Sequence, residues 1–111
     1  MNVHILTSKA GAAEGFLKAL ANRYRLMILC ELHQGERSVG ALQNAIGLSQ
    51  SALSQHLARL RKDGLVTTRR AAQTIYYSLS SKRVTKIVAL LYEFYCSPEC
   101  GEPSKKKGRK R

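Results

Sequence analysis

The stretch from Ser49 to Arg61 constrains the fold most strongly, because it has the pattern of an amphipathic helix with an unusual polar side. Leu53, Leu57 and Leu60 recur at helical spacing and are expected to face a core. The other side carries short hydrogen-bonding groups, where a solvated helix more often carries glutamate and lysine. The short groups are those of Ser51, Ser54 and Gln55, and Lys62 lies on the same side. This face is therefore either a solvated surface or one that reads base edges in the major groove of DNA, which admits one helix.

The segments around this stretch predict a helix-turn-helix. Ser38 can cap a short helix that runs through Ala45, and Gly47 can end it. Ser49 can cap the polar-faced helix, which continues through Lys62. Two helices joined by such a short turn have the layout of a DNA-binding helix-turn-helix.

Two further helices are predicted upstream. Residues 9–21 are rich in alanine and should direct Phe16, Leu17 and Leu20 inward, and residues 23–34 should form the second helix. Both would supply apolar surface for one core under the helix-turn-helix.

Downstream, the apolar period changes from that of a helix to that of strands. Residues 65–70 and 74–79 are rich in β-branched and aromatic residues and predict a hairpin. Its connection at 71–73 lacks an Asn-Gly pair, so we expect a longer, mobile tip. A basic hairpin carrying Arg69 and Arg70 directly after a candidate recognition helix is a wing. The predicted fold class is therefore mainly α with a small β-hairpin, a winged helix-turn-helix.

The predicted last helix, at residues 82–95, is apolar around too much of its surface for a small monomer. Its apolar side chains cover roughly 200° of the helical wheel, about twice the stripe that one core face needs. They are Val84, Ile87, Val88, Leu90, Leu91, Tyr92, Phe94 and Tyr95. One side should pack on its own core and the other on a second subunit, so a homodimer is expected. The alternative is that the tyrosine hydroxyls simply face water.

The charge of the chain favours a polyanionic partner. The formal net charge is +12, and without the six basic residues between Lys105 and Arg111 it is still +6. Nucleic acid is the first candidate for the partner and an anionic membrane surface the second. The C-terminal run itself should add non-specific, salt-dependent affinity for DNA, or serve only as a solubilising tail.

The sequence also predicts the organisation of the chain and the compartment in which it works. We expect a flexible N-terminus at residues 1–8, a single domain at 9–96 and a disordered basic tail at 97–111. No apolar run reaches the roughly 18 residues that span a bilayer, and no secretory signal is recognised, so a cytoplasmic protein is expected. Its three cysteines are then not expected to form a permanent disulfide framework.

The order of these elements resembles the ArsR/SmtB family of bacterial winged-helix repressors. The resemblance covers about residues 12–96 and is carried by residues 20–29, 49–57, 60–66, Arg70 and 75–77. It implies a homodimer that joins through its first and last helices. It also implies binding to an imperfect palindrome in double-stranded promoter DNA, with release when an inducer binds.

The family pattern places a set of polar and basic residues at the DNA. It puts Gln50, Ser51, Ser54 and Gln55 at the major groove, with the Arg69–Arg70 wing beside it. The flanking Arg59, Arg61 and Lys62 can reach phosphates, which set register without carrying sequence information directly. His56 lies on the flank of the leucine face, where we expect it to pack against the helix-turn-helix rather than touch a base.

Neither of the common metal sites of the family is present. The segment Ser38–Leu42, where many relatives carry a Cys-x-Cys pair, has no thiol. The last helix has no His or Asp, and Glu93 is its only carboxylate, whereas zinc or nickel needs three or four ligands. We therefore expect no metal and no cofactor.

Two cysteines point to the inducer. Cys30 and Cys96 resemble the matching pair of the persulfide- and redox-sensing branch, the BigR-like and HlyU-like regulators. The resemblance implies that a disulfide or short polysulfide bridge between them weakens operator binding. Cys100 is a possible accessory thiol. From the residues alone, a buried inert Cys30 remains the alternative, whereas Cys96 ends a helix in an electropositive region that favours reactivity.

The sequence thus predicts a DNA-binding repressor of sulfur- or redox-response genes that is switched by Cys30 and Cys96. One alternative is a metal-responsive repressor whose non-standard site is built from Cys96, Cys100 and His4. Another is an inducer-independent DNA-binding or anti-repressor protein. An enzyme is not expected, because no His, Asp or Glu is placed to activate a thiol in a recognisable constellation.

Overall fold

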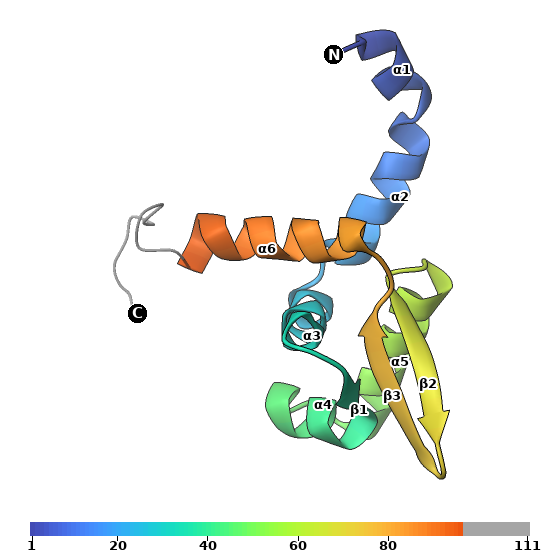
Figure 1. Cartoon of the computed structure of the whole chain (residues 1–111), viewed down its shortest axis with the longest axis vertical. Coiled ribbons are helices and arrows are strands. Elements are labelled where there is room, and N and C mark those ends of the chain that lie inside the picture. Colours follow the sequence, from blue (N-terminus) through green and yellow to red (C-terminus); the bar gives the residue numbers. More distant parts are fainter. Residues whose placement is uncertain (97–111) are drawn as a thin grey trace.

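The predicted helix-turn-helix lies in the lower part of Figure 1 as α4 and α5, beside a β-hairpin. The computed structural model describes residues 1–96. The elements are α1 (Val3–Ser8), α2 (Ala10–Leu20), α3 (Arg23–His33), β1 (Arg37–Ser38), α4 (Val39–Ile46), α5 (Gln50–Lys62), β2 (Val66–Ala71), β3 (Thr74–Leu79) and α6 (Lys82–Cys96). The order from α2 to α6 confirms the predicted winged helix-turn-helix, to which the structure adds α1 and the short β1.

Local side-chain caps place the helices of the helix-turn-helix. The Ala41 backbone N–H donates to Ser38 Oγ at 3.1 Å, and the Ala52 N–H donates to Ser49 Oγ at 3.1 Å, so both predicted N-caps are confirmed. Gly47 ends α4 with a left-handed φ of 83°, which a residue with a Cβ adopts at a cost. These caps hold the turn between α4 and α5 short.

The end of α5 leads directly into the wing. The Leu65 N–H donates to the Leu60 carbonyl at 2.9 Å and the Gly64 N–H to the Arg61 carbonyl at 3.1 Å, which is the bond pair of a Schellman motif. Leu65 and Val66 follow and are buried. The end of α5 is therefore hydrogen-bonded and buried directly at the start of β2.

The sheet has three antiparallel strands in the order β1-β3-β2. Val66 pairs with Leu79 at its base and Ala71 with Thr74 at its tip. The expected longer tip was wrong, because pairing continues to Ala71 and leaves a two-residue loop. Ala72 makes this loop with a φ of 57°, so the chain accepts a left-handed alanine where no Asn-Gly pair is available.

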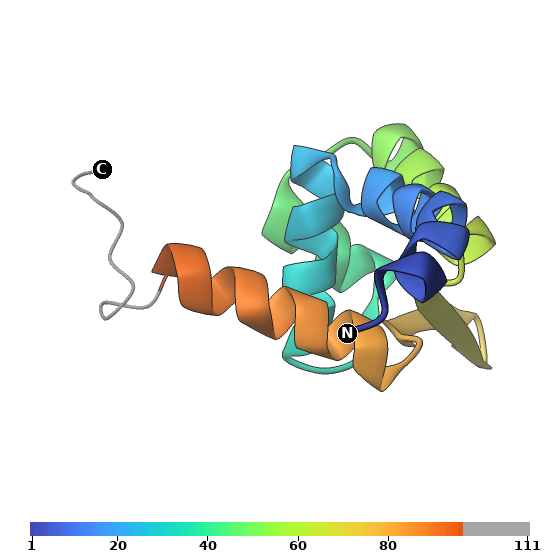
Figure 2. The ribbon, with the colours of Figure 1, turned by 90° about the horizontal axis from the view of Figure 1, so that it is seen from above.

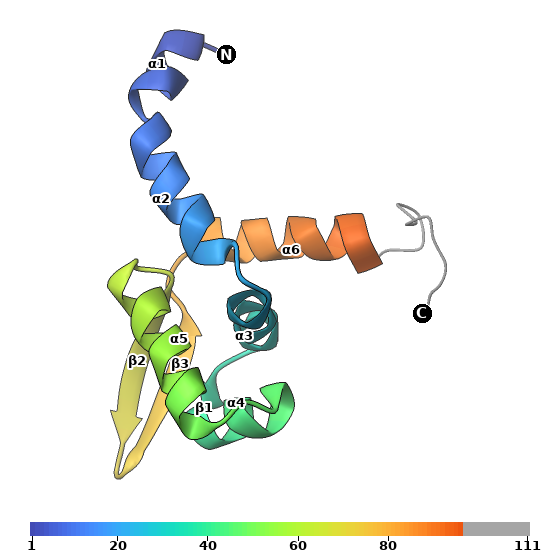
Figure 3. The ribbon, with the colours of Figure 1, turned by 180° about the vertical axis from the view of Figure 1, so that it is seen from behind.

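One core lies between the helices and the sheet. Figure 3 shows α5 lying over one face of the hairpin, with α3 beside α5 and below α6. The buried core side chains are Ala19, Leu20, Ile28, Leu29, Leu32, Leu42, Leu53, Leu57, Leu60, Leu65, Val66, Val84 and Val88. The three leucines of the polar-faced helix are among them, as predicted.

The N-terminal segment contains a helix that was not predicted. Val3–Ser8 forms α1, because Asn2 Oδ1 accepts from the His4 N–H at 2.9 Å and caps it; the expected flexibility of residues 1–8 stays a prediction. None of the residues of α1 is buried. Leu17 was expected to point inward but is 57% exposed, because α2 rests on the body mainly through its end, at Ala19 and Leu20.

The last helix extends beyond the body. Figures 1 and 2 show the C-terminal half of α6 projecting away from the other helices and strands. Val84 and Val88 are buried in its first half, whereas Leu90, Tyr92, Phe94 and Tyr95 are exposed in its second. The excess of apolar surface predicted for this helix is thus present in the structure. Within residues 1–96, no helix is long and apolar enough to cross a membrane.

Candidate functional site

The polar side of α5 is open to solvent. Gln50, Ser51, Ser54 and Gln55 are all exposed, while the leucines of the same helix are buried beneath them. The four residues predicted to enter the DNA major groove therefore lie on one solvent-accessible helix, as a recognition helix requires.

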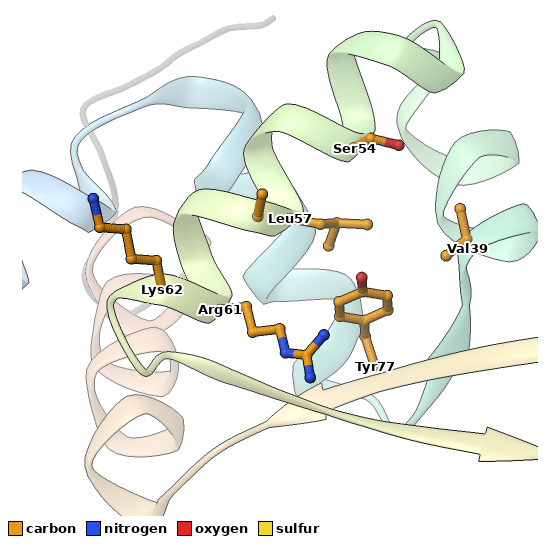
Figure 4. Close-up of a pocket in the computed structure, with 7 residues that line it drawn as sticks. Val39, Ser54, Leu57, Arg61, Lys62 and Tyr77 are labelled. Carbon is orange, nitrogen blue, oxygen red and sulfur yellow. The ribbon is translucent and has the colours of Figure 1, made fainter.

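A hollow separates this side of α5 from the wing. It has a volume of about 530 Å³ and is lined by Val39, Ser54, Leu57, Ala58, Arg61, Lys62 and Tyr77. In Figure 4, Arg61 and Tyr77 lie between α5 and the strands, and Ser54 points toward α4. A second hollow, of about 570 Å³, adjoins the start of α5 and is lined by Gln50 together with Gln73 and Ile75 of the hairpin. Helix and wing thus form one concave surface.

Arg61 is the basic residue that this surface adds to the predicted set. It was expected only as a flanking phosphate contact, yet it lines the hollow together with Ser54. The signal was present in the sequence, because positions seven apart lie on the same side of a helix. Lys62 lines the same hollow.

Arg59 occupies a different side of α5. Its Nε donates to Asp63 Oδ2 at 2.6 Å, four residues later. It lines a hollow with Gly15 and Phe16 of α2, not the hollow beside the wing. The structure therefore separates Arg59 from Ser54 and Arg61, although all three were grouped from the sequence.

The two wing arginines point to opposite faces of the sheet. Arg70 pairs with Ile75 and Arg69 with Tyr76, and directly paired residues of an antiparallel ladder share a face. Ile75 lines the hollow beside α5, so Arg70 is on the α5 side. Arg69 is on the far side, where it contacts Glu36.

His56 packs between α5 and α3. Its ring lies 6.0 Å from the ring of Tyr24 in α3, centroid to centroid. Partial burial lowers the pKa of His56, and the nearby charge of Arg25 lowers it further. A neutral imidazole is thereby favoured between α3 and α5.

The two cysteines lie on opposite walls of one groove. This thiol groove, of about 470 Å³, is lined by Cys30, His33 and Gln34 from α3 and by Val88, Ala89, Tyr92 and Cys96 from α6. Cys30 was weighed as a buried residue, but it is exposed, and both cysteines are free thiols. No lysine or arginine lines the groove.

The surroundings of Cys30, including Cys96 on the other wall of the groove, raise the pKa of its thiol. Desolvation raises the pKa of its thiol, the charge of Cys96 raises it further, and that of Glu31 adds a smaller effect in the same direction. The charge of Cys96 thus disfavours the thiolate of Cys30, as expected when a second sulfur lies nearby.

The remaining predicted thiol and the basic tail lie outside the described residues, namely Cys100 and Lys105–Arg111. Among residues 1–96, no group of three or more His, Cys, Asp or Glu side chains could hold a metal ion.

A helix-turn-helix with an exposed reading helix and a basic wing defines the winged helix-turn-helix class of transcriptional regulators, which bind DNA. Comparison with known proteins agrees. Residues 22–68 match the model of the bacterial regulatory proteins of the arsR family. The chain belongs to this arsR family, and it is a transcriptional regulator.

Individual members of the comparison are similar to this chain over most of its length. The transcriptional activator HlyU of Vibrio cholerae is 52% identical over 96 residues, which are 86% of this chain and 89% of HlyU. The nodulation protein NolR of Rhizobium meliloti is 58% identical over 78% of this chain and 70% of NolR. The crystal structure of the transcriptional repressor BigR from Xylella fastidiosa superposes with a TM-score of 0.81 at 38% identity, over 86% of this chain and 98% of that one. These relatives include both an activator and a repressor.

Proposed function

We propose that this regulator is a dithiol-switched repressor of sulfur- or redox-response genes, which leaves its operator when Cys30 and Cys96 become bridged. The observation that carries the proposal is the thiol groove between α3 and α6. Cys30 of α3 and Cys96 of α6, which are far apart in sequence, both line it. A disulfide requires Cα atoms about 4.4–6.8 Å apart, and a polysulfide bridge tolerates a wider gap. A groove between two helices suits the second kind of bridge as well as the first.

The chemistry requires only a persulfide donor and the two thiols. One cysteine thiolate attacks the outer sulfur of R–S–SH, the S–S bond breaks, and the leaving thiolate takes up a proton. The other cysteine then attacks the sulfur of the modified cysteine and expels HS⁻, which closes a disulfide. If a second donor first extends the chain, closure at the middle sulfur expels HS⁻ and leaves one inserted sulfur.

We propose that the concave surface between α5 and the wing is the DNA interface. Gln50, Ser51, Ser54 and Gln55 would face base edges, since their amide and hydroxyl groups can donate and accept. Arg61 and Arg70 would contact phosphates from the two sides of the hollow. Arg59 and Arg69, which the sequence also assigned to DNA, are held in ion pairs with Asp63 and Glu36.

We propose that a second copy covers the exposed apolar side of α6 together with α1 and α2. The free surface includes Leu6 and Leu17 of the first helices and Leu90 and Phe94 of the last. Two-fold symmetry would set the two reading helices about 34–36 Å apart, so that they enter successive major grooves of an imperfect palindrome.

The switch is tested with reduced protein and an organic persulfide donor. We expect the intact mass to report a Cys30–Cys96 bridge with zero, one or two inserted sulfurs. Affinity for a duplex that the reduced protein selects from a randomised pool should fall at the same time. Cys30→Ser and Cys96→Ser should keep the reduced affinity and lose the response, whereas Cys100→Ser, the matched control, should keep both. Unchanged DNA affinity of the bridged wild type would refute the switch.

A further inference from the structure

A bidentate ion pair clasps the wing on the face that is turned away from α5. Arg69 Nη2 donates to Glu36 Oε1 at 2.7 Å, and Arg69 Nε donates to Glu36 Oε2 at 3.0 Å. The Ser78 hydroxyl donates to Glu36 Oε2 at 3.4 Å. The Arg69 guanidinium also lies 4.7 Å from the centre of the Tyr76 ring. The carboxylate therefore binds two side chains of the hairpin, Arg69 and Ser78, and Arg69 also contacts Tyr76.

This group of side chains, called the clasp below, consists of Glu36, Arg69, Tyr76 and Ser78 and crosses the whole sheet. Arg69 belongs to β2 at one edge, Tyr76 and Ser78 belong to the central β3, and Glu36 immediately precedes β1 at the other edge. An isolated surface ion pair contributes little, but a bidentate arginine within a network keeps a fixed geometry. The bond to Arg69 lowers the pKa of Glu36, and the carboxylate raises the pKa of Arg69, so both groups stay charged near neutral pH. The pair thus ties the hairpin to the polypeptide that leaves α3.

The position of the clasp decides where each wing arginine can act. The face that carries Arg69 is the one opposite to Ile75 and to the hollow beside α5. Two of the guanidinium nitrogens of Arg69 already donate to Glu36. Arg70, one residue further along, is on the α5 face.

We infer that Glu36 is a positioning residue for DNA binding, which holds the wing through Arg69 and so directs Arg70 at the duplex. Arg69 then acts as a fastening of the wing and not as a phosphate contact. This inference rests on DNA binding by the concave surface and is independent of the thiol switch.

DNA-binding measurements on reduced protein test whether Arg69 holds the wing through Glu36 or instead contacts a DNA phosphate. The two roles predict opposite effects of Glu36→Gln on DNA affinity. We compare Glu36→Gln, Arg69→Gln, their double variant and the charge swap Glu36→Arg/Arg69→Glu, on the duplex that the wild type selects. If Glu36 fastens the wing, both single variants lose affinity several-fold and the double variant loses no more than either. The swap, which restores an ion pair without changing net charge, recovers part of the loss. If Arg69 contacts a phosphate, Glu36→Gln keeps or gains affinity and the swap is the weakest binder, which overturns the inference.

The salt dependence and a matched control sharpen the result. Arg70→Gln should lower the slope of log affinity against log salt by about 0.9, the value of one phosphate contact. Arg69→Gln should leave the slope near that of the wild type.

Amide hydrogen exchange of the free protein tests the clasp without any DNA. Exchange in β2 and β3 should accelerate in Glu36→Gln and Arg69→Gln, return toward the wild-type rate in the swap, and stay unchanged in Arg70→Gln. Wild-type exchange rates in both single variants would show that the pair does not hold the wing.

Discussion

At the scale of single residues, the structure distinguishes side chains that the sequence makes look equivalent. Arg69 and Arg70 are adjacent and identical, but one fastens to Glu36 and the other is on the face toward α5. Arg59 and Arg61 divide in the same way, one toward Asp63 and the other toward the wing. Counting basic residues therefore overestimates the number free to meet a phosphate.

The environment of Cys30 predicts a change in its reactivity when Cys96 is removed. Desolvation and the Cys96 charge both raise the pKa of the Cys30 thiol, so Cys96→Ser removes the second cause and leaves the first. The thiolate of Cys30 then forms at lower pH. We expect the pH profile of Cys30 alkylation, followed by peptide mass spectrometry with iodoacetamide, to move toward lower pH in Cys96→Ser.

A matched variant separates proximity from general effects on the fold. Glu31→Gln should shift the same profile in the same direction but less, because Glu31 is the smallest of the three causes. An identical profile in wild type and Cys96→Ser would mean that the two sulfurs do not share a site.

At the scale of elements, the wing shows how pairing overrides turn preference. Ala72 takes a φ of 57° at the first position of a two-residue loop, where glycine is favoured in type II′ turns. A left-handed conformation costs a residue with a Cβ about 1–2 kcal/mol. The strands maintain their register up to Ala71 and Thr74 despite this cost.

Ala72→Gly should therefore stabilise the protein. We expect a gain of about 0.5 kcal/mol in the free energy of unfolding, since relief of the left-handed strain exceeds the extra chain entropy of glycine. Urea unfolding measures it. Gln73→Gly is the control, because among the described non-glycine residues a positive φ occurs at Ala72 alone, so this variant should lose stability slightly. A loss in Ala72→Gly as large as that of the control would contradict the left-handed assignment.

The elements that the sequence predicted correctly are those whose signals are local. Ser38, Ser49 and Gly47 bound their helices as expected, because a cap involves only neighbours in the chain. The two-residue β1 was missed, since Arg37 and Ser38 become a strand only through pairing with Tyr77 and Tyr76. The clasp was missed for the same reason: Glu36 and Arg69 are brought together by the sheet. The thiol pair was suggested by a family resemblance and not by spacing.

At the scale of the whole molecule, two segments extend away from the body that contains the core. The α1–α2 segment and the end of α6 both leave the body in Figure 1, and both carry exposed apolar side chains. Large exposed apolar patches on a protein surface usually mark an interaction site. Assembly would bury them without changing the core.

Phe94→Glu should separate the subunits of the proposed dimer without unfolding them. Phe94 is 51% exposed in the single chain and does not line the thiol groove, so a carboxylate is tolerated there until a second copy covers it. We expect sedimentation to report a monomer, and affinity for the palindromic duplex to fall at least tenfold, because two half-sites are no longer bound together. Adjacent Glu93→Gln is the control and should stay dimeric. A dimeric Phe94→Glu protein with full affinity would place the interface elsewhere.

Cys96 is the last residue of α6, so a small displacement at the thiol groove would act at the tip of a long helix. Fifteen residues of helix make an arm of about 22 Å. Drawing the tip by roughly 1 Å toward Cys30 would turn such an arm by about 3°, from the same rise per residue. Two symmetry-related arms would displace their reading helices in opposite senses, and a spacing matched to one turn of DNA would be lost at both half-sites at once. A bridge formed as proposed would thus act at the far end of α6, without touching the DNA-binding surface.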